Sequence, residues 1–267
     1  MLPPTGAAGT SDEQRREYRV RGFLRESFAL GDPTLLPELC RDVAQFDRKL
    51  AEWQALGYAR VAYLFTAAIE RVAHDAAIRM VVEALLGTDR WVVWGPNILR
   101  ETPNAASRWH VDLETQYWPS VTVAIGLSGC SAQSAIWCLS GTHLLARTPA
   151  WSGDDSDTDR VVRHARRAKP EVGSPEQFEA FGDGRFYVFD ARTWHRGDPG
   201  ASGDRLVLFL HYQPAVARRV PLVLDYIRHR WSREAAPYIA GPGAKPTTTV
   251  ARVPLREHVL AVAARLR

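Results

Sequence analysis

Apolar residues recur at intervals of three and four along the first third of the chain, and this pattern ends before Trp91. From about Ser11 to Leu86 the stretches VRGFLRESFAL, ELCRDVAQFDRKLAEW and FTAAIERVAHDAAIRMVVEALLG carry the spacing of amphipathic helices. Ser11 suits the start of the first helix, and Gly87 suits the end of the last. The pattern predicts about three or four helices over residues 12–88.

From Trp91 to about residue 213, short runs of β-branched and aromatic residues replace the helical spacing, and Pro, Gly and Asn separate them. Such runs are typical of the strands of an antiparallel sandwich or barrel. They are WVVWGPNILR, SRWHVDLE, SVTVAIGLS, SAIWCLS, RFYVFDARTWH and RLVLFLHY. With the helices ahead of them, they predict a mainly β fold with flanking helices, built as a single domain over 1–267.

Three further segments complete the predicted organisation. Residues 1–11, rich in Pro, Gly and Ala, are expected to form a disordered lead. An insertion over 144–184 contains GDDSDTD and RVVRHARRAKP, and then SPEQFEAF, which is expected to form a short helix. The insertion is either a solvated loop or a lid over a site at the mouth of the barrel. Residues 214–267 are expected to add C-terminal helices near VPLVLDYIRHRW and REHVLAVAARLR.

Composition narrows the functional classes. An apolar content of 46% is ample for a core, and a net charge of +4 with scattered basic residues does not favour nucleic acid as a partner. No stretch approaches ~20 uninterrupted apolar residues, so we expect no membrane partner. Cys40, Cys130 and Cys138 have neither metal-ligand nor disulfide spacing, which favours the reducing cytoplasm. The oligomeric state does not follow from the pattern.

His110 and Asp112 stand two residues apart in SRWHVDLET. Side chains at positions i and i+2 of a strand point to the same face, so this pair can reach one ion while Val111 faces the other way. The alternative is that both are polar side chains on the solvent face of a strand. A third ligand is needed to decide between the two interpretations.

His195 is a candidate for that third ligand. It is expected to end the strand run RFYVFDARTWH, and Arg205 is expected to open the next strand after the turn-forming stretch GDPGASGD. Hairpin pairing around this stretch predicts that His195 lies nearly opposite Arg205. A histidine and a cation would then share one end of the sandwich.

Two imidazoles and one carboxylate on one face form the facial triad of non-haem Fe(II) oxygenases, which leaves coordination positions open. A 2-oxo acid chelates iron through two atoms, and dioxygen needs a further position. An arginine at the length of the co-substrate from the metal can hold the far carboxylate of 2-oxoglutarate. His110, Asp112 and His195 have the residue types of this donor set, and Arg205 has that of such an arginine.

The order of these residues resembles the phytanoyl-CoA dioxygenase-like family of Fe(II)/2-oxoglutarate-dependent oxygenases. That family has H-x-D, a histidine about eighty residues later and an arginine ten residues beyond it, as this chain has. LSGTH, residues 139–143, is similar to the family's P-G-[ST]-H turn, and RWHVDLET resembles the W-H-x-D-F-E-T segment of ectoine hydroxylases. The resemblance implies a double-stranded β-helix (jelly roll or cupin-like) core over 91–213, with Fe(II), 2-oxoglutarate and O2 as cofactor and co-substrates. It implies that His110, Asp112 and His195 are the catalytic metal ligands and that Arg205 binds the distal carboxylate of 2-oxoglutarate.

The resemblance also implies contacts beyond the triad. Asn97 falls where family members place an amide on the co-substrate, and Thr122 is carried over as a further co-substrate contact. Members often have Ser or Thr two residues after the distal histidine to assist the arginine, whereas this chain has Gly197, with Thr193 or Ser202 as substitutes. Related halogenases replace the carboxylate of Asp112 with Gly or Ala, so we do not expect halogenation.

Tryptophans near the triad suggest the kind of substrate. By alternation Trp109 and Trp194 should point away from the metal into packing. Wide aromatic faces beside polar groups suit a ring-bearing, hydroxylated ligand, which predicts a small-molecule natural product that contains carbohydrate. The aromatic-rich texture resembles the oxygenases of orthosomycin biosynthesis, which form orthoester rings. The predicted substrate contacts are Glu114, Trp118, Trp137, His143 and Trp151.

Other functions remain open at this stage. One is hydroxylation of a small amino-acid-like substrate, as in ectoine hydroxylases. Another is a non-catalytic, sugar-binding jelly roll, and a third is a metal-dependent isomerase or hydrolase of the cupin kind, which would not need Arg205. His211 lies on the strand of Arg205 with the same parity, and it is either near the site or a satisfied core residue.

Overall fold

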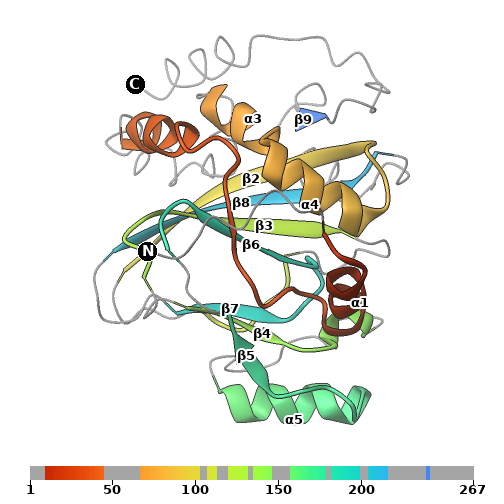
Figure 1. The fold of residues 1–267 in the computed structure, drawn as a ribbon. Coiled ribbons are helices and arrows are strands. Elements are labelled where there is room, and N and C mark those ends of the chain that lie inside the picture. Colours follow the sequence, from red (N-terminus) through yellow and green to blue (C-terminus); the bar gives the residue numbers. More distant parts are fainter. Residues whose placement is uncertain are drawn as a thin grey trace, which may run out of the picture.

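The computed structural model describes residues 10–44, 67–102, 107–112, 120–131, 135–145, 157–178, 182–198, 204–215 and 239–240. Within them, two antiparallel sheets lie one above the other, and helices lie on both outer sides (Figure 1). The larger sheet has the strand order β1-β6-β3-β8-β2-β9, and the smaller has the order β5-β4-β7. This arrangement confirms the predicted mainly β fold with flanking helices.

The helices are α1 (Asp12–Arg21), residues 35–44, α3 (Ala67–Ala73), α4 (Ala76–Leu86) and α5 (Thr158–Ala168), with a short 3-10 helix, η2, at Thr142–Leu144. The strands of the larger sheet are β1 (Phe28–Ala29), β2 (Trp91–Glu101), β3 (Val121–Ser128), β6 (Arg185–Phe189), β8 (Arg205–Pro214) and β9 (Ile239–Ala240). Those of the smaller sheet are β4 (Ala135–Leu139), β5 (Pro175–Gln177) and β7 (His195–Asp198).

Local signals explain where the first helices begin and end. Ser11 forms a capping box with Gln14 at the start of α1, and Gly22 ends the helix with φ at +88°, a conformation that favours glycine. Asp75 caps α4 by accepting from two of its first amides and also accepts from the amides of Gly31 and Asp32. One carboxylate therefore fixes α4 to the preceding loop.

Strand β8 has two different faces, and they divide the interior. One face of β8 packs against α3 and α4 in the main core, on the side away from the smaller sheet, through Leu208, Leu210 and Tyr212. Val207 and Phe209 point the other way, into a second cluster between the two sheets. Because Arg205 and His211 share the parity of Val207, they also lie on the face that the smaller sheet covers.

Helix α5 covers the outer face of the smaller sheet, where Figure 1 places it beyond β4 and β5. Val161 and Ala165 of α5 form a third cluster with Trp109 and Trp194. The described part of the 144–184 insertion thus packs behind the sheet, which argues against a lid role for this part. RVVRHARRA forms a helix, and the predicted helix at SPEQFEAF is wrong, because Pro175–Gln177 pairs with β4 as an edge strand.

The predicted hairpin between the strands of His195 and Arg205 is also wrong. A turn over residues 190–193, closed by the amide of Thr193 on the carbonyl of Asp190, breaks the run RFYVFDARTWH in two. The second piece, β7, pairs with β4, whereas β8 lies between β3 and β2 in the other sheet. His195 therefore begins a strand, and it faces Arg205 across the space between the sheets.

The helical prediction for residues 12–88 is confirmed for α1, residues 35–44, α3 and α4. It is wrong for most of VRGFLRESFAL, because Gly22 ends α1 in a left-handed conformation and Phe28–Ala29 pairs with β6 as a strand. The predicted disordered lead lies almost wholly outside the described residues. The same holds for the C-terminal helices, except that Ile239–Ala240 pairs with β2 as a strand. Among the described residues, no helix is both long enough and apolar enough to span a membrane.

Candidate metal centre

The backbones of two chain segments hold the predicted ligands side by side. The amide of His110 donates to the carbonyl of His195 at 2.9 Å, and the amide of His195 donates back to the carbonyl of His110 at 2.9 Å. Two residues along, the amide of Asp112 donates to the carbonyl of Ala191 at 3.0 Å. These ladder bonds place all three residues at the edge of the smaller sheet, where β7 begins.

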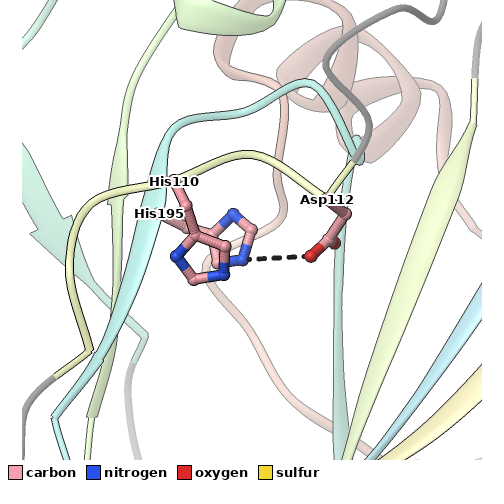
Figure 2. A group of neighbouring side chains, drawn as sticks. All are labelled: His110, Asp112 and His195. Atoms are coloured by element: carbon pink, nitrogen blue, oxygen red, sulfur yellow. Dashed lines mark ion pairs between the residues drawn. The ribbon is translucent and has the colours of Figure 1, made fainter. Parts of the chain in front are cut away.

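The side chains of His110, Asp112 and His195 converge, as Figure 2 shows. One potential ligand atom from each lies within 4.8 Å of the other two. The Nδ1 atom of His110 donates to the carbonyl of Arg108 at 2.8 Å, and the Nδ1 atom of His195 donates to the carbonyl of Thr193 at 2.9 Å. Because a carbonyl only accepts, the neutral rings carry their protons on Nδ1 and present Nε2 lone pairs to a metal.

Asp112 is oriented by neighbours on two strands of the larger sheet. Thr122 Oγ1 donates to Asp112 Oδ2 at 3.0 Å and lies 3.0 Å from Nδ1 of His211, which donates to it. The other carboxylate oxygen, Oδ1, lies 3.5 Å from Nε2 of His195. Thr122 and His211 therefore fix one oxygen of Asp112 and leave the other directed at the histidines.

Burial and charge act in opposite directions on these groups. Burial alone would raise the pKa of Asp112. The adjacent histidines, chiefly His195 and His211, together have the larger, opposite effect, so the pKa of Asp112 lies below its usual range. Burial alone would lower the pKa of His195, but Asp112 raises it above its ordinary value. Desolvation, and then the charge of His195, lower the pKa of His110. Although surrounding protein atoms desolvate its ring, part of the surface of His110 is exposed, so the group meets solvent on that side.

The tryptophans beside the ligands confirm the predicted alternation. Trp109 and Trp194 are each 1% exposed and lie in the cluster beneath α5, on the opposite face of the strands from the ligands. Trp109 Nε1 also donates to Thr158 Oγ1 at the start of α5. Cys138 and Phe189 lie on the ligand side instead, where the ring of Phe189 is 4.6 Å from that of His195.

Arg205 lies buried, 1% exposed, and its Nε donates to Oε2 of Glu101, which is 6% exposed. The two residues stand opposite each other in the β2–β8 ladder. A Cβ atom added at Gly197 would overlap Oε1 of Glu101 and lie 2.9 Å from Nη2 of Arg205. The absence of a side chain at position 197 therefore leaves room for this ion pair on the ligand face of β7.

Two other predicted co-substrate residues, Asn97 and Thr122, lie on β2 and β3, the strands on either side of β8. Thr122 donates to the predicted ligand Asp112, and its contact with the co-substrate stays a prediction. Asn97 lies half-buried in β2 opposite Phe209, and its role stays a prediction. The hydroxyl of Thr193 donates to the carbonyl of Gly22, so Thr193 does not assist Arg205.

The predicted substrate contacts are placed less favourably. Trp137 packs with the cluster under α5, on the face of β4 that points away from the ligands, which argues against a substrate contact. His143 is 4% exposed and bonds the carbonyl of Arg19 through Nε2, so its contact with substrate stays a prediction. Glu114, Trp118, Trp151 and Ser202 lie outside the described residues.

Sequence reasoning missed Glu101. Glu101 ends the strand run NILRE, where a buried glutamate is unusual unless it is paired. This position was the only sequence feature that could have indicated a buried ion pair. His211 was left between two interpretations, and its contacts with Thr122 and Asp112 place it beside the site.

Solved structures share this fold. A non-haem α-ketoglutarate-dependent carbocyclase, SnoK from nogalamycin biosynthesis, is 17% identical with a TM-score of 0.59, over 83% of this chain and 93% of that one. The epimerase SnoN, in complex with Fe3+, α-ketoglutarate and nogalamycin RO, is 17% identical with a TM-score of 0.56, over 89% and 93%. EctD from S. alaskensis, with 2-oxoglutarate and 5-hydroxyectoine, is 16% identical with a TM-score of 0.54, over 80% and 79%.

No family model matches the chain, and no curated protein matches it. The likeness to solved structures extends over most of the chain, and it defines the fold class: a double-stranded β-helix of the kind found in non-haem, 2-oxoglutarate-dependent oxygenases. The fold that the motif resemblance implied is therefore confirmed.

Proposed function

We propose that this protein is an Fe(II)- and 2-oxoglutarate-dependent oxygenase that oxidises a C–H bond of a small-molecule natural product. The observation that carries the proposal is the convergence of His110, Asp112 and His195, whose ligand atoms lie within 4.8 Å of one another. Two imidazole nitrogens and one carboxylate oxygen on one face form the donor set that non-haem Fe(II) prefers, with positions left for co-substrates.

The surrounding residues fit such a metal. Both histidines direct Nε2 inward, because backbone carbonyls accept from their Nδ1 atoms. Thr122 holds one oxygen of Asp112, so the other can ligate alone. Arg205 supplies the buried cation for the distal carboxylate of 2-oxoglutarate. Bound iron would supply the activation of dioxygen, coupled to the conversion of 2-oxoglutarate to succinate and CO2.

The substrate is, in this proposal, a natural product that contains carbohydrate, and the reaction is hydroxylation or an oxidative cyclisation such as orthoester formation. The similar folds of a carbocyclase and an epimerase from nogalamycin biosynthesis support a substrate of this general kind. Retention of Asp112 supports oxygenation over halogenation, since the carboxylate occupies the place a halide would need. The exposed side of His110 offers the route by which such a substrate reaches the metal.

A second candidate is hydroxylation of a small amino-acid-like compound, and the fold shared with EctD favours it. The two candidates differ in what stimulates the enzyme. A panel of glycosylated compounds and of cyclic amino acids, scored by succinate formed above the substrate-free rate, separates them. A binding protein without catalysis would form no succinate with any compound of the panel.

The proposal is tested by adding Fe(II) and 2-oxoglutarate to the protein without oxygen. Chelation of the metal by the 2-oxo acid should give a weak visible charge-transfer band, and His110→Ala should abolish it because one ligand is lost. His74→Ala is the matched control, since His74 lies against Trp91 in the helical layer, and it should keep the band. Absence of the band in the unmodified protein at saturating Fe(II) would contradict the proposal.

A further inference from the structure

The buried ion pair between Glu101 and Arg205 occupies the place that the proposed function assigns to a co-substrate. Arg205 is 1% exposed and Glu101 is 6% exposed, so neither charge is solvated by bulk water. Arg205 Nε donates to Oε2 of Glu101. The cation that would hold an incoming carboxylate is thus already bound to a carboxylate of the protein.

The pair lies next to the metal ligands. Gly197 and His195 are two residues apart on β7, so they share a face of the strand and are separated by about 6.6 Å. The carboxylate of Glu101 and Nη2 of Arg205 both approach the position of a Cβ at Gly197. A 2-oxo acid chelated at His195 and extended along β7 would therefore reach both charges of the pair.

Only one of the two carboxylate oxygens of Glu101 accepts a hydrogen bond from Arg205 among the described contacts. Oε1 of Glu101 is buried and accepts no hydrogen bond from the described residues, so Glu101 is held through Oε2. A carboxylate bound through one oxygen is held less firmly than one bound by both. A second carboxylate can therefore compete for the guanidinium.

We propose that Glu101 is a specificity-determining residue for the co-substrate, because its carboxylate competes with the distal carboxylate of the 2-oxo acid for Arg205. This inference rests on the proposed function. When the site is empty, Glu101 neutralises the buried Arg205. When a dianionic 2-oxo acid binds, two carboxylates face one guanidinium, and their repulsion raises the concentration of co-substrate that the enzyme needs.

Glu101→Gln separates charge from shape. The amide oxygen of Gln can still accept from Arg205 Nε, so the guanidinium keeps its orientation while the competing charge is lost. We expect half-saturation by 2-oxoglutarate to occur at a concentration lower by about tenfold or more. For 2-oxopentanoate, which has the same chain length and no distal carboxylate, we expect little change. Glu38→Gln removes a carboxylate from a surface ion pair and serves as the control.

The experiment is an anaerobic titration of each Fe(II)-loaded variant with the two 2-oxo acids, followed through the charge-transfer band and by calorimetry. A selective gain for 2-oxoglutarate in Glu101→Gln supports the inference. If the unmodified protein gives a band and Glu101→Gln binds 2-oxoglutarate equally or more weakly, Glu101 only orients Arg205 and the inference fails alone. An equal gain for both acids also overturns it. If no variant gives a band, the proposed function fails and the inference with it.

Discussion

His110 and His195 exchange two backbone hydrogen bonds, each 2.9 Å long, so that the two histidines form a bridged pair between segments 85 residues apart in the sequence. Their ring centroids lie 4.3 Å apart. Because the main chain fixes this spacing, the two imidazoles are close together before any metal arrives. The main chain of Asp112 is held in the same ladder, and the orientation of its carboxylate depends on its side-chain partners, which the first prediction concerns.

Thr122→Val should weaken metal binding by about 10- to 100-fold, because it removes the hydroxyl that orients Asp112 while keeping the shape of the side chain. Thr122→Ser keeps a hydroxyl and should stay close to the unmodified protein. The measurement is Fe(II) or Co(II) affinity by anaerobic competition with a chelating dye. Equal affinities for the Val and Ser variants would show that Thr122 does not position Asp112.

Metal affinity should fall as the pH is lowered through the pKa of His195. Asp112 raises that pKa above the ordinary value of 6.5, despite the opposing effect of burial. A metal needs the neutral ring, so below this pKa binding must displace a proton, and proton release per metal should increase as the pH is lowered from about 8 to about 6.5. Calorimetry in buffers of different ionisation enthalpy measures this number. An affinity that stays constant from about pH 8 to about pH 6 would contradict the prediction.

Gly197→Ala should destabilise the protein by about 1–3 kcal/mol, because the new methyl group would overlap the carboxylate of Glu101. Shortening that side chain should remove the overlap, so the additional cost of Gly197→Ala should shrink in a Glu101→Ala background. Denaturant unfolding of the four proteins in this cycle gives the coupling energy. Additive effects would mean that the two positions do not meet.

Asp75→Ala should lower the free energy of unfolding by about 2–3 kcal/mol, since the carboxylate accepts from amides of α4 and of the loop before residues 35–44. The metal centre lies on the other side of the larger sheet, so the affinity for metal per folded molecule should not change. Asp75→Asn keeps one acceptor oxygen and should cost less. A loss of metal affinity without loss of stability would be the contrary result.

The periodicity of apolar positions predicted those features of the fold that depend only on residues close together in the sequence. The spacing of apolar residues identified the helices at residues 35–44, α3 and α4, although it also wrongly predicted a helix over residues 22–30. Alternation placed Trp109 and Trp194 opposite the ligands. Both are local properties, because a side chain's face follows from its position in a strand or helix. The pairing of β7 is not local, and the turn before it is short enough to read as part of one strand.

The same distinction applies to the candidate site. His110 and Asp112 could be recognised because their spacing of two residues is itself the signal. Glu101 and Arg205 are 104 residues apart, and only the register between β2 and β8 brings them together. Gly197 carries no local turn signal that explains it. Glycine is required at position 197 because Glu101 of β2 and Arg205 of β8 approach β7 there, and this contact exists only when the two sheets are packed together.

Helix α5 touches neither the ligands nor the space between the sheets, yet it packs on Trp109 and Trp194, which directly precede the two histidines. A partner molecule or chemical label that draws α5 away from those rings would loosen both histidine segments at once. The spectrum of a metal held by His110 and His195 would then report on events at the outer surface. Changes at the outer surface of α5 could therefore alter the candidate metal centre through the two tryptophans, without any contact with His110 or His195.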